Sequence, residues 1–72
     1  MTSGQMIRQL RSNRNLSLEK TAQDLNISKS ALAMYERDER VPRDQVKLRI
    51  AEYFQVSVES LFYYPGEHIC AQ

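Results

Sequence analysis

The sequence contains few of the residues on which disulfide frameworks, metal sites and phosphate-binding loops depend. Its 72 residues include one cysteine, one histidine and two glycines, Gly4 and Gly66. A single cysteine, Cys70, excludes an intramolecular disulfide, and His68 alone cannot complete a metal site with it, so we expect no metal and no other cofactor. With no glycine-rich loop and no nucleophile beside a histidine in a known motif, we expect that the protein is not an enzyme.

Long hydrophobic stretches are missing as well. The apolar runs, such as residues 31–34 and 61–64, are only a few residues long. A membrane span needs about 18 apolar residues, and the core of a signal peptide needs about 7–15. We therefore expect no membrane partner, and the low cysteine content predicts a cytoplasmic, reducing environment.

The net charge is close to zero, but the charges are unevenly placed. Ten Lys and Arg residues oppose nine Asp and Glu residues, which gives +1. Residues 1–49 hold all ten basic residues and six acidic ones, a net charge of +4, whereas residues 50–72 carry −3. Most of the aromatic residues also lie in the second segment. Because groove binding depends on the local field, the small total does not exclude a nucleic-acid partner.

The spacing of apolar residues predicts helices and no strand, because no stretch sustains apolar–polar alternation. Helices are expected at residues 4–14, 18–25, 28–37 and 44–54, with a short fifth at 58–62. Ser17, Ser28 and Ser57 are suited to cap three of them, and Pro42 prevents a helix from running through the polar loop 38–42. We expect one compact all-α domain at residues 4–63, followed by a tail at 64–72.

The second and third predicted helices carry the most informative pattern. Apolar or small residues repeat at helical spacing through both of them: Leu18, Thr21, Ala22, Leu25, Leu32 and Tyr35. Two short helices joined by three or four residues must cross steeply, which the small side chain of Ala22 permits. Asn26 tolerates the positive φ that the turn requires. The pattern is typical of a helix-turn-helix, whose second helix enters the DNA major groove.

From Ile7 to about Phe62 the chain resembles the Cro/cI-type (Xre-type) helix-turn-helix domain of phage repressors and related bacterial regulators. The residues that carry this resemblance are Ile7, Arg8, Leu10, Arg11, Leu16, Ser17, Ala22, Leu25, Ile27, Ser28, Leu32, Tyr35, Glu36, Arg37, Pro42, Ala51, Val56 and Ser57. Family members commonly have glycine at the helix ends, where this chain has Asn15, Asn26, Asp38 and Gln55. Asn and Asp are the next-best residues for a left-handed backbone. The resemblance implies a five-helix lambda-repressor-like fold and a DNA-binding transcriptional repressor.

In the family that this chain resembles, the outer face of the third helix contacts base edges. Matching positions make Lys29, Ser30 and Met34 the base-contact candidates, with Ala33 a weaker one. Lys29 can donate to guanine, Ser30 can bond to several bases, and Ala33 or Met34 can pack against a thymine methyl group. The alternative is that Lys29 and Ser30 form a solvated face and that Met34 fills the core.

Contacts to the DNA backbone are expected from the starts of the second and third helices and from the arginines after the third. The candidates are Ser17, Leu18, Ser28, Arg37, Arg40 and Arg43. Leu18 stands where relatives often have a glutamine that binds a phosphate, so its backbone N–H alone is left for this contact. For each of these arginines, a merely solvated side chain is an equal alternative.

Two further sets of residues are assigned by the resemblance. Arg11 and Glu36 match positions that pair in several relatives, and they predict a salt bridge that orients the third helix. The dimer interface is expected on the fifth helix and the link before it, at Val56, Val58, Leu61, Phe62 and Tyr63. Phe62 and Tyr63 are the stronger candidates, because Val56 and Leu61 are expected to seal the fourth and fifth helices. Alternatively, the two aromatic residues cover the base of their own domain.

The expected assembly is a homodimer on double-stranded DNA, with one domain on each half of a palindromic operator. A rival hypothesis is a protein-interaction module, such as an antitoxin or an antagonist of another repressor, whose main partner is a regulatory protein. The modest charge, Leu18 and Met34 favour this rival.

Overall fold

In the computed structural model, residues 2–62 are described, and they form five α-helices and no strand. The helices are α1 (Ser3–Asn13), α2 (Leu18–Leu25), α3 (Lys29–Glu36), α4 (Asp44–Phe54) and α5 (Val58–Phe62). The predicted all-α class and five helices are confirmed, and the bounds of α1 and α3 differ from the prediction by one residue at each end. No helix within residues 2–62 is long and apolar enough to cross a membrane. The predicted tail at 64–72 lies outside the described residues.

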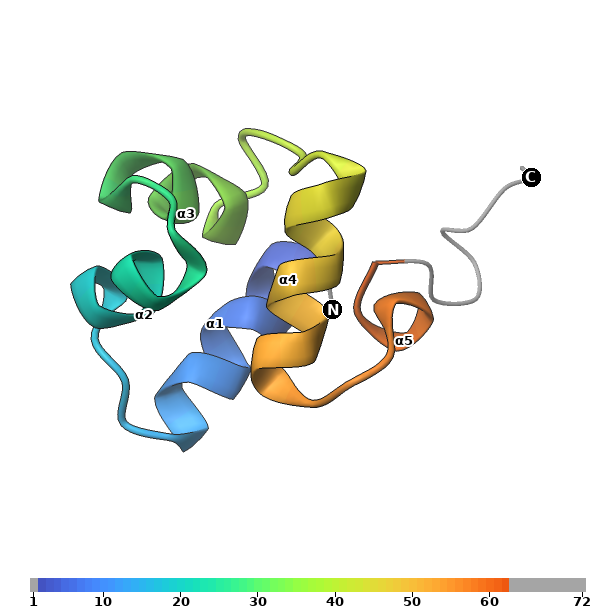
Figure 1. Ribbon diagram of the computed structural model, residues 1–72, viewed down its shortest axis with the longest axis horizontal. Coiled ribbons are helices and arrows are strands. Elements are labelled where there is room, and N and C mark those ends of the chain that lie inside the picture. The colour runs from blue at the N-terminus through green and yellow to red at the C-terminus, as the bar shows by residue number, and fades with distance from the viewer. Residues whose placement is uncertain (1, 63–72) are drawn as a thin grey trace.

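The helices pack around one small core. In Figure 1, α1 and α4 occupy the middle of the molecule, with α2 and α3 towards one end and α5 towards the other. α3 packs against α1 and α2, and α4 packs against α2 and α5. The core takes side chains from all five helices: Ile7, Ala22, Leu25, Leu32, Tyr35, Ile50, Phe54 and Leu61. Because every helix buries at least one of them, the position of α3 is fixed by the whole domain.

Each of the first four helices is terminated by a residue with a left-handed backbone, and none of the four is glycine. These residues are Asn15, Asn26, Asp38 and Gln55, with φ between 56° and 61°. After Asn26, the N–H of Ile27 donates to the carbonyl of Ala22 at 3.0 Å, and the other three ends repeat this bond. This is the Schellman motif, which satisfies carbonyls at a helix end. The expectation that these four positions end helices with a left-handed backbone is therefore confirmed.

Candidate nucleic-acid interface

The turn between α2 and α3 has the helix-turn-helix geometry predicted from the sequence. Asn26 is left-handed, and Ile27 packs against the core directly after it. Ala22 and Thr21 are buried on the inner side of α2. Leu32 and Tyr35 are buried on α3. With its inner face held in this way, α3 presents the opposite face to solvent.

The outward face of α3 carries the four predicted base-contact residues. Ser30, Ala33 and Met34 share this face at i, i+3 and i+4, and Lys29 lies at its first turn. Lys29 and Ser30 are exposed, whereas Ala33 and Met34 are half-buried. Among the described residues, the partly buried side chains that pack against the core include Ala31 but neither Ala33 nor Met34. The alternative in which Met34 fills the core is therefore not supported.

The first turns of α2 and α3 offer polar groups near this face. The Ser17 hydroxyl oxygen accepts from the Lys20 N–H, and that of Ser28 accepts from the Ala31 N–H, both at 3.0 Å. Each serine therefore still has its own hydroxyl proton to donate, and the first N–H groups of a helix have no partner within the helix. Leu18 is half-buried and packs against the core, so its backbone N–H is its only polar group there.

Most of the basic side chains fall into two groups. Side chains of the first group donate to carbonyl oxygens at helix ends or form ion pairs within the domain. Arg14 Nη2 donates to the Phe54 carbonyl at 2.8 Å at the end of α4, and Arg49 Nη1 donates to the Leu25 carbonyl at 2.8 Å at the end of α2. Lys20 pairs with Asp24 at 3.3 Å. A positive charge near the last carbonyls of a helix also suits the helix dipole.

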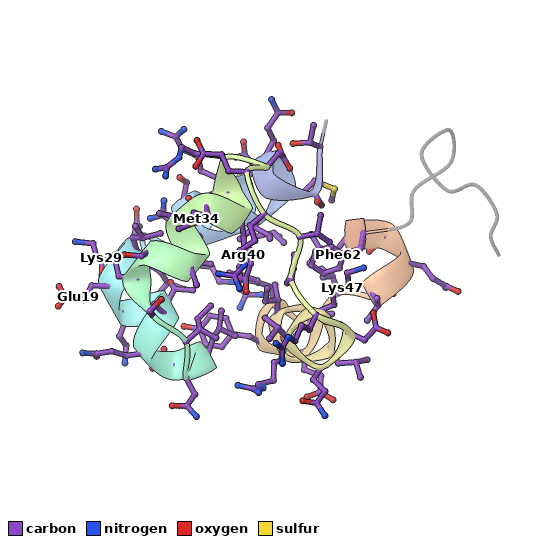
Figure 2. All side chains as sticks on the ribbon, turned by 90° about the horizontal axis from the view of Figure 1, so that it is seen from above. Glu19, Lys29, Met34, Arg40, Lys47 and Phe62 are labelled. Atoms are coloured by element: carbon purple, nitrogen blue, oxygen red, sulfur yellow. The ribbon has the colours of Figure 1, made fainter. Side chains whose placement is uncertain are left out.

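The second group of basic side chains extends into solvent. Lys29, Arg40 and Arg43 are exposed and make no ion pair or hydrogen bond with a described residue. Figure 2 looks onto the face that holds Lys29 and Met34 on α3 and Arg40 in the loop after it. Arg37 bonds to Glu39 at 3.1 Å, but both side chains are largely exposed, so this pair is weak and easily exchanged for another anion.

The predicted salt bridge between Arg11 and Glu36 is present and is bidentate. Arg11 Nε and Nη2 donate to the two carboxylate oxygens of Glu36 at 2.7 and 3.0 Å. A third donor, Nη1, reaches the Leu16 carbonyl at 2.9 Å. The hydrogen bonds that Arg11 donates to the Glu36 carboxylate raise the pKa of Arg11 above its ordinary value. The pair joins the last turn of α1 to the last residue of α3.

A second contact between α1 and α3 was not predicted from the sequence. The Asp38 carboxylate accepts from the Gly4 N–H at 3.1 Å and from the Thr2 hydroxyl at 2.5 Å. Thr2 in turn caps α1 through the Gln5 N–H. Asp38 therefore caps the start of α1 from the loop that ends α3.

A third contact holds α2 against α4. The Tyr53 hydroxyl donates to Asp24 Oδ2 at 2.6 Å. This hydrogen bond lowers the pKa of Asp24 and raises that of Tyr53. Because α2 carries α3 through the turn, the contact contributes to the orientation of the outward face.

The predicted dimer residues differ in their surroundings. Leu61 is 0 % exposed, as its expected role in sealing α4 and α5 requires, so it has no surface for a partner and is removed from the interface candidates. Val56 and Phe62 are half-buried against the core, and the Lys47 ammonium lies 5.5 Å from the centre of the Phe62 ring (Figure 2). Val58 is half-buried without packing against the core. Tyr63 lies outside the described residues.

Residues 2–62 contain no group of three or more His, Cys, Asp or Glu side chains placed to hold a metal ion. The sequence analysis did not predict the contacts that hold the helices around the outward face, which are made by Thr2, Gly4, Arg14, Asp38, Arg49 and Tyr53. Only Gly4 carried a signal, since glycine is unfavourable inside a helix and its presence needs a reason.

Comparisons with known proteins agree with this geometry. The family model for the helix-turn-helix domain matches residues 4–67. No curated protein matches the chain. The structure of the P22 c2 repressor with synthetic operator 9T in the presence of Tl⁺ superposes with a TM-score of 0.83 at 22 % identity, covering 88 % of this chain and 96 % of that one. At 22 % identity, this match shows that the two proteins share a fold and nothing more.

Two structures of SinR are similar in sequence as well. SinR, the master regulator for biofilm formation, in complex with DNA has a TM-score of 0.76 and 31 % identity, covering 83 % of this chain and 97 % of that one. The SinR/SinI protein complex has a TM-score of 0.78 and 29 % identity, covering 94 % of this chain and 67 % of that one. The family match over most of the chain, the fold and the turn geometry lead to one conclusion: the chain belongs to the helix-turn-helix domain family, of the Cro/cI type.

Proposed function

We propose that the protein is a sequence-specific DNA-binding transcription regulator that inserts α3 into the major groove. The observation that carries this proposal is the outward face of α3, which is held by buried residues on one side and leaves Lys29 and Ser30 exposed on the other. Arg40 and Arg43 extend from the loop that follows and suit phosphate contacts on either side of the groove. The P22 c2 repressor and SinR, which share the fold, have been crystallised with DNA.

The proposed assembly is a cytoplasmic homodimer that represses transcription from a palindromic operator. One domain of this size spans about half an operator, so two copies on half-sites one helical turn apart supply the affinity. Val56, Val58, Phe62 and Tyr63 are the proposed interface residues. The partly exposed apolar surface of the first three supports this assignment.

The test is selection of bound duplexes from a random DNA pool, followed by fluorescence anisotropy at two salt concentrations. We expect a symmetric sequence bound by two chains, whose affinity falls with salt while its preference over a shuffled duplex persists. Lys29→Ala should weaken binding, whereas Ser12→Ala, at an exposed and uncharged position of α1, should not. Failure to bind any DNA at low salt would contradict the proposal.

A second candidate function is binding to a regulatory protein. Val41 and Leu48 are large hydrophobic residues that are 75 % and 54 % exposed, and the related SinR forms a complex with SinI protein. If the protein binds no DNA, this function becomes the favoured one. It then predicts that Leu48→Ser leaves folding intact and abolishes capture of the partner.

A further inference from the structure

The two helix starts beside the outward face of α3 carry opposite charges. α3 begins at Ser28 and Lys29, and its first turn contains no acidic residue. α2 begins at Ser17 and Leu18, and Glu19 is the acidic residue of its first turn. Figure 2 shows Glu19 and Lys29 at the same edge of the molecule. A DNA backbone that passes both helix starts therefore meets a positive charge at one of them and a negative charge at the other.

The negative charge of Glu19 has no cation beside it to neutralise it. The Glu19 side chain is exposed and makes no ion pair or hydrogen bond with a described residue. Its neighbour Lys20 pairs instead with Asp24, at 3.3 Å. A carboxylate in the first turn of a helix does suit the helix dipole, so Glu19 stabilises α2. Its charge nevertheless remains available to act on a phosphate outside the domain.

The groups that could attract a phosphate to the start of α2 are weaker than this charge. Leu18 is half-buried against the core and offers only its backbone N–H. The Ser17 hydroxyl is a neutral donor. The dipole at a helix start is equivalent to about half a positive charge, whereas the exposed carboxylate carries a full negative one. The electrostatic balance at the start of α2 is therefore repulsive for a phosphate, in contrast to the start of α3.

We propose that Glu19 makes the start of α2 repel the DNA backbone, so that the domain holds DNA through α3 and the loop after it. This proposal rests on the proposed function, because it concerns the same bound DNA. Phosphates are alike in every sequence and carry no sequence information. Glu19 therefore weakens binding to the operator and to unrelated DNA by the same factor. The chain leaves unrelated DNA more readily, and its preference for the operator is unchanged.

The experiment removes the charge of Glu19 and keeps the size of its side chain. Glu19→Gln is compared with the wild type and with Glu52→Gln, which removes an exposed carboxylate in the last turn of α4, at the other end of that helix from Arg43. Dissociation constants are measured by anisotropy for the duplex selected from the random pool and for a shuffled duplex, at two salt concentrations. Because loss of the charge slightly weakens α2, tighter binding by Glu19→Gln cannot come from a better-folded variant.

The expected result is that Glu19→Gln binds both duplexes about two- to fivefold more tightly for each bound chain, as expected for one unit charge several ångströms from a phosphate in water. The gain should shrink at the higher salt concentration. Glu52→Gln should bind as the wild type does.

Three results would overturn the proposal while leaving the proposed function intact. The wild type selects a duplex, but Glu19→Gln binds it no more tightly. Alternatively, Glu52→Gln gains as much as Glu19→Gln, which would show that only the total charge matters. In the third case, the gain of Glu19→Gln is confined to one of the two duplexes, which would show that the effect depends on sequence. If no duplex is selected at all, the proposed function itself fails, and this proposal fails with it.

Discussion

Gly4 lies where α1 passes closest to the end of α3. A Cβ atom at this position would lie 2.4 Å from the Tyr35 carbonyl oxygen and 2.7 Å from that of Glu36. Both are backbone atoms, which cannot turn aside as a flexible side chain can. The two helices therefore meet at this distance because residue 4 has no side chain, and the meeting point fixes the angle at which α3 leaves the domain.

Gly4→Ala is expected to destabilise the fold, although alanine is the better helix former. Helix propensity alone would favour alanine by about 1 kcal/mol, whereas forcing a methyl group against the backbone should lower the free energy of unfolding by about 1–3 kcal/mol. Urea denaturation followed by circular dichroism measures the sign of this change in the free energy of unfolding. Ser12→Ala, an exposed position of the same helix, is the control and should be neutral or slightly stabilising. A stabilised Gly4→Ala variant would contradict the close contact.

The Arg11–Glu36 pair is largely shielded, since the two side chains are 17 % and 8 % exposed. Removing either partner leaves a poorly solvated charge, so Arg11→Ala and Glu36→Ala should each lower the free energy of unfolding by about 1–3 kcal/mol. Arg11→Ala should have the larger effect, because the bond to the Leu16 carbonyl is lost as well. The double variant, measured by urea denaturation, should be no less stable than Arg11→Ala. Additive losses would show that the pair acts as two independent residues.

The ends of the helices determine how the elements are arranged. The left-handed residue after each of the first four helices turns the chain back towards the core. At two of these ends a distant arginine donates to a carbonyl: Arg49 at α2 and Arg14 at α4. Asp38, the left-handed residue after α3, instead accepts from the Gly4 N–H at the start of α1. Short helices leave a large share of their carbonyls without an internal partner. Guanidinium donors that satisfy these carbonyls therefore also join neighbouring helices.

Two left-handed positions should respond in opposite ways to glycine. Gln55 has no side-chain hydrogen bond with a described residue, so Gln55→Gly relieves backbone strain and should raise the free energy of unfolding by about 0.5–1 kcal/mol. Asp38→Gly relieves the same strain but removes the acceptor of Gly4 and Thr2, and we expect a net loss of stability. The midpoints of urea denaturation test this contrast. Stabilisation of both variants would show that the Asp38 carboxylate contributes little, whereas destabilisation of both would show that Gln55 is not strained.

The contact between α2 and α4 should make stability depend on pH at both extremes. The pKa of Asp24 is lowered in the fold, so its contribution is present above the unfolded value of about 4 and disappears as the pH falls below it. The pKa of Tyr53 is raised, so its contribution is present below about 10 and disappears as the pH rises above it. The difference in unfolding free energy between wild type and Tyr53→Phe should thus be constant near neutral pH and shrink at both ends. A difference that does not vary with pH would contradict the coupling.

For the molecule as a whole, the net charge of +4 over residues 1–49 overstates the charge available to DNA. Arg11, Arg14 and Arg49 are used inside the domain. The sequence shows how many basic residues there are, whereas the structure shows which of them extend into solvent. Few positively charged side chains are therefore available for DNA phosphates on one domain. This makes the second copy in the proposed dimer important for affinity.

The salt dependence of DNA binding measures how many positive charges contact the DNA phosphates. With Lys29, Arg40 and Arg43 on phosphates or bases, the slope of log K against log salt concentration should be about −3 for each bound chain. Arg43→Ala should reduce the slope by about 1. Arg49→Ala should lower the stability of the fold and leave the slope unchanged, provided that circular dichroism shows the variant folded at the assay temperature. Equal slopes for wild type and Arg43→Ala would remove Arg43 from the contact surface.

Local signals in the sequence predicted the helices, the serine caps, the left-handed ends and the turn before α3. These features depend on neighbouring residues, for which spacing and residue type are sufficient. The arginine bonds to helix ends and the Asp38 contact join residues that are 24 to 40 positions apart. No local pattern distinguishes such an arginine from a solvated one, so these contacts needed the structure. The location of the outward face was predicted for the same local reason, whereas the burial of Leu61 removed one interface candidate.

The outward face of α3 and the core draw on different residues. Ala33 and Met34 do not pack against the core, and the Lys29 and Ser30 side chains extend away from it. In the proposed complex, substitutions at these positions would therefore change which DNA sequence is bound, with little effect on whether the chain folds. If α3 reads DNA as proposed, a few such substitutions are enough to change the preferred operator, whereas the stability of the fold depends on the rest of the domain.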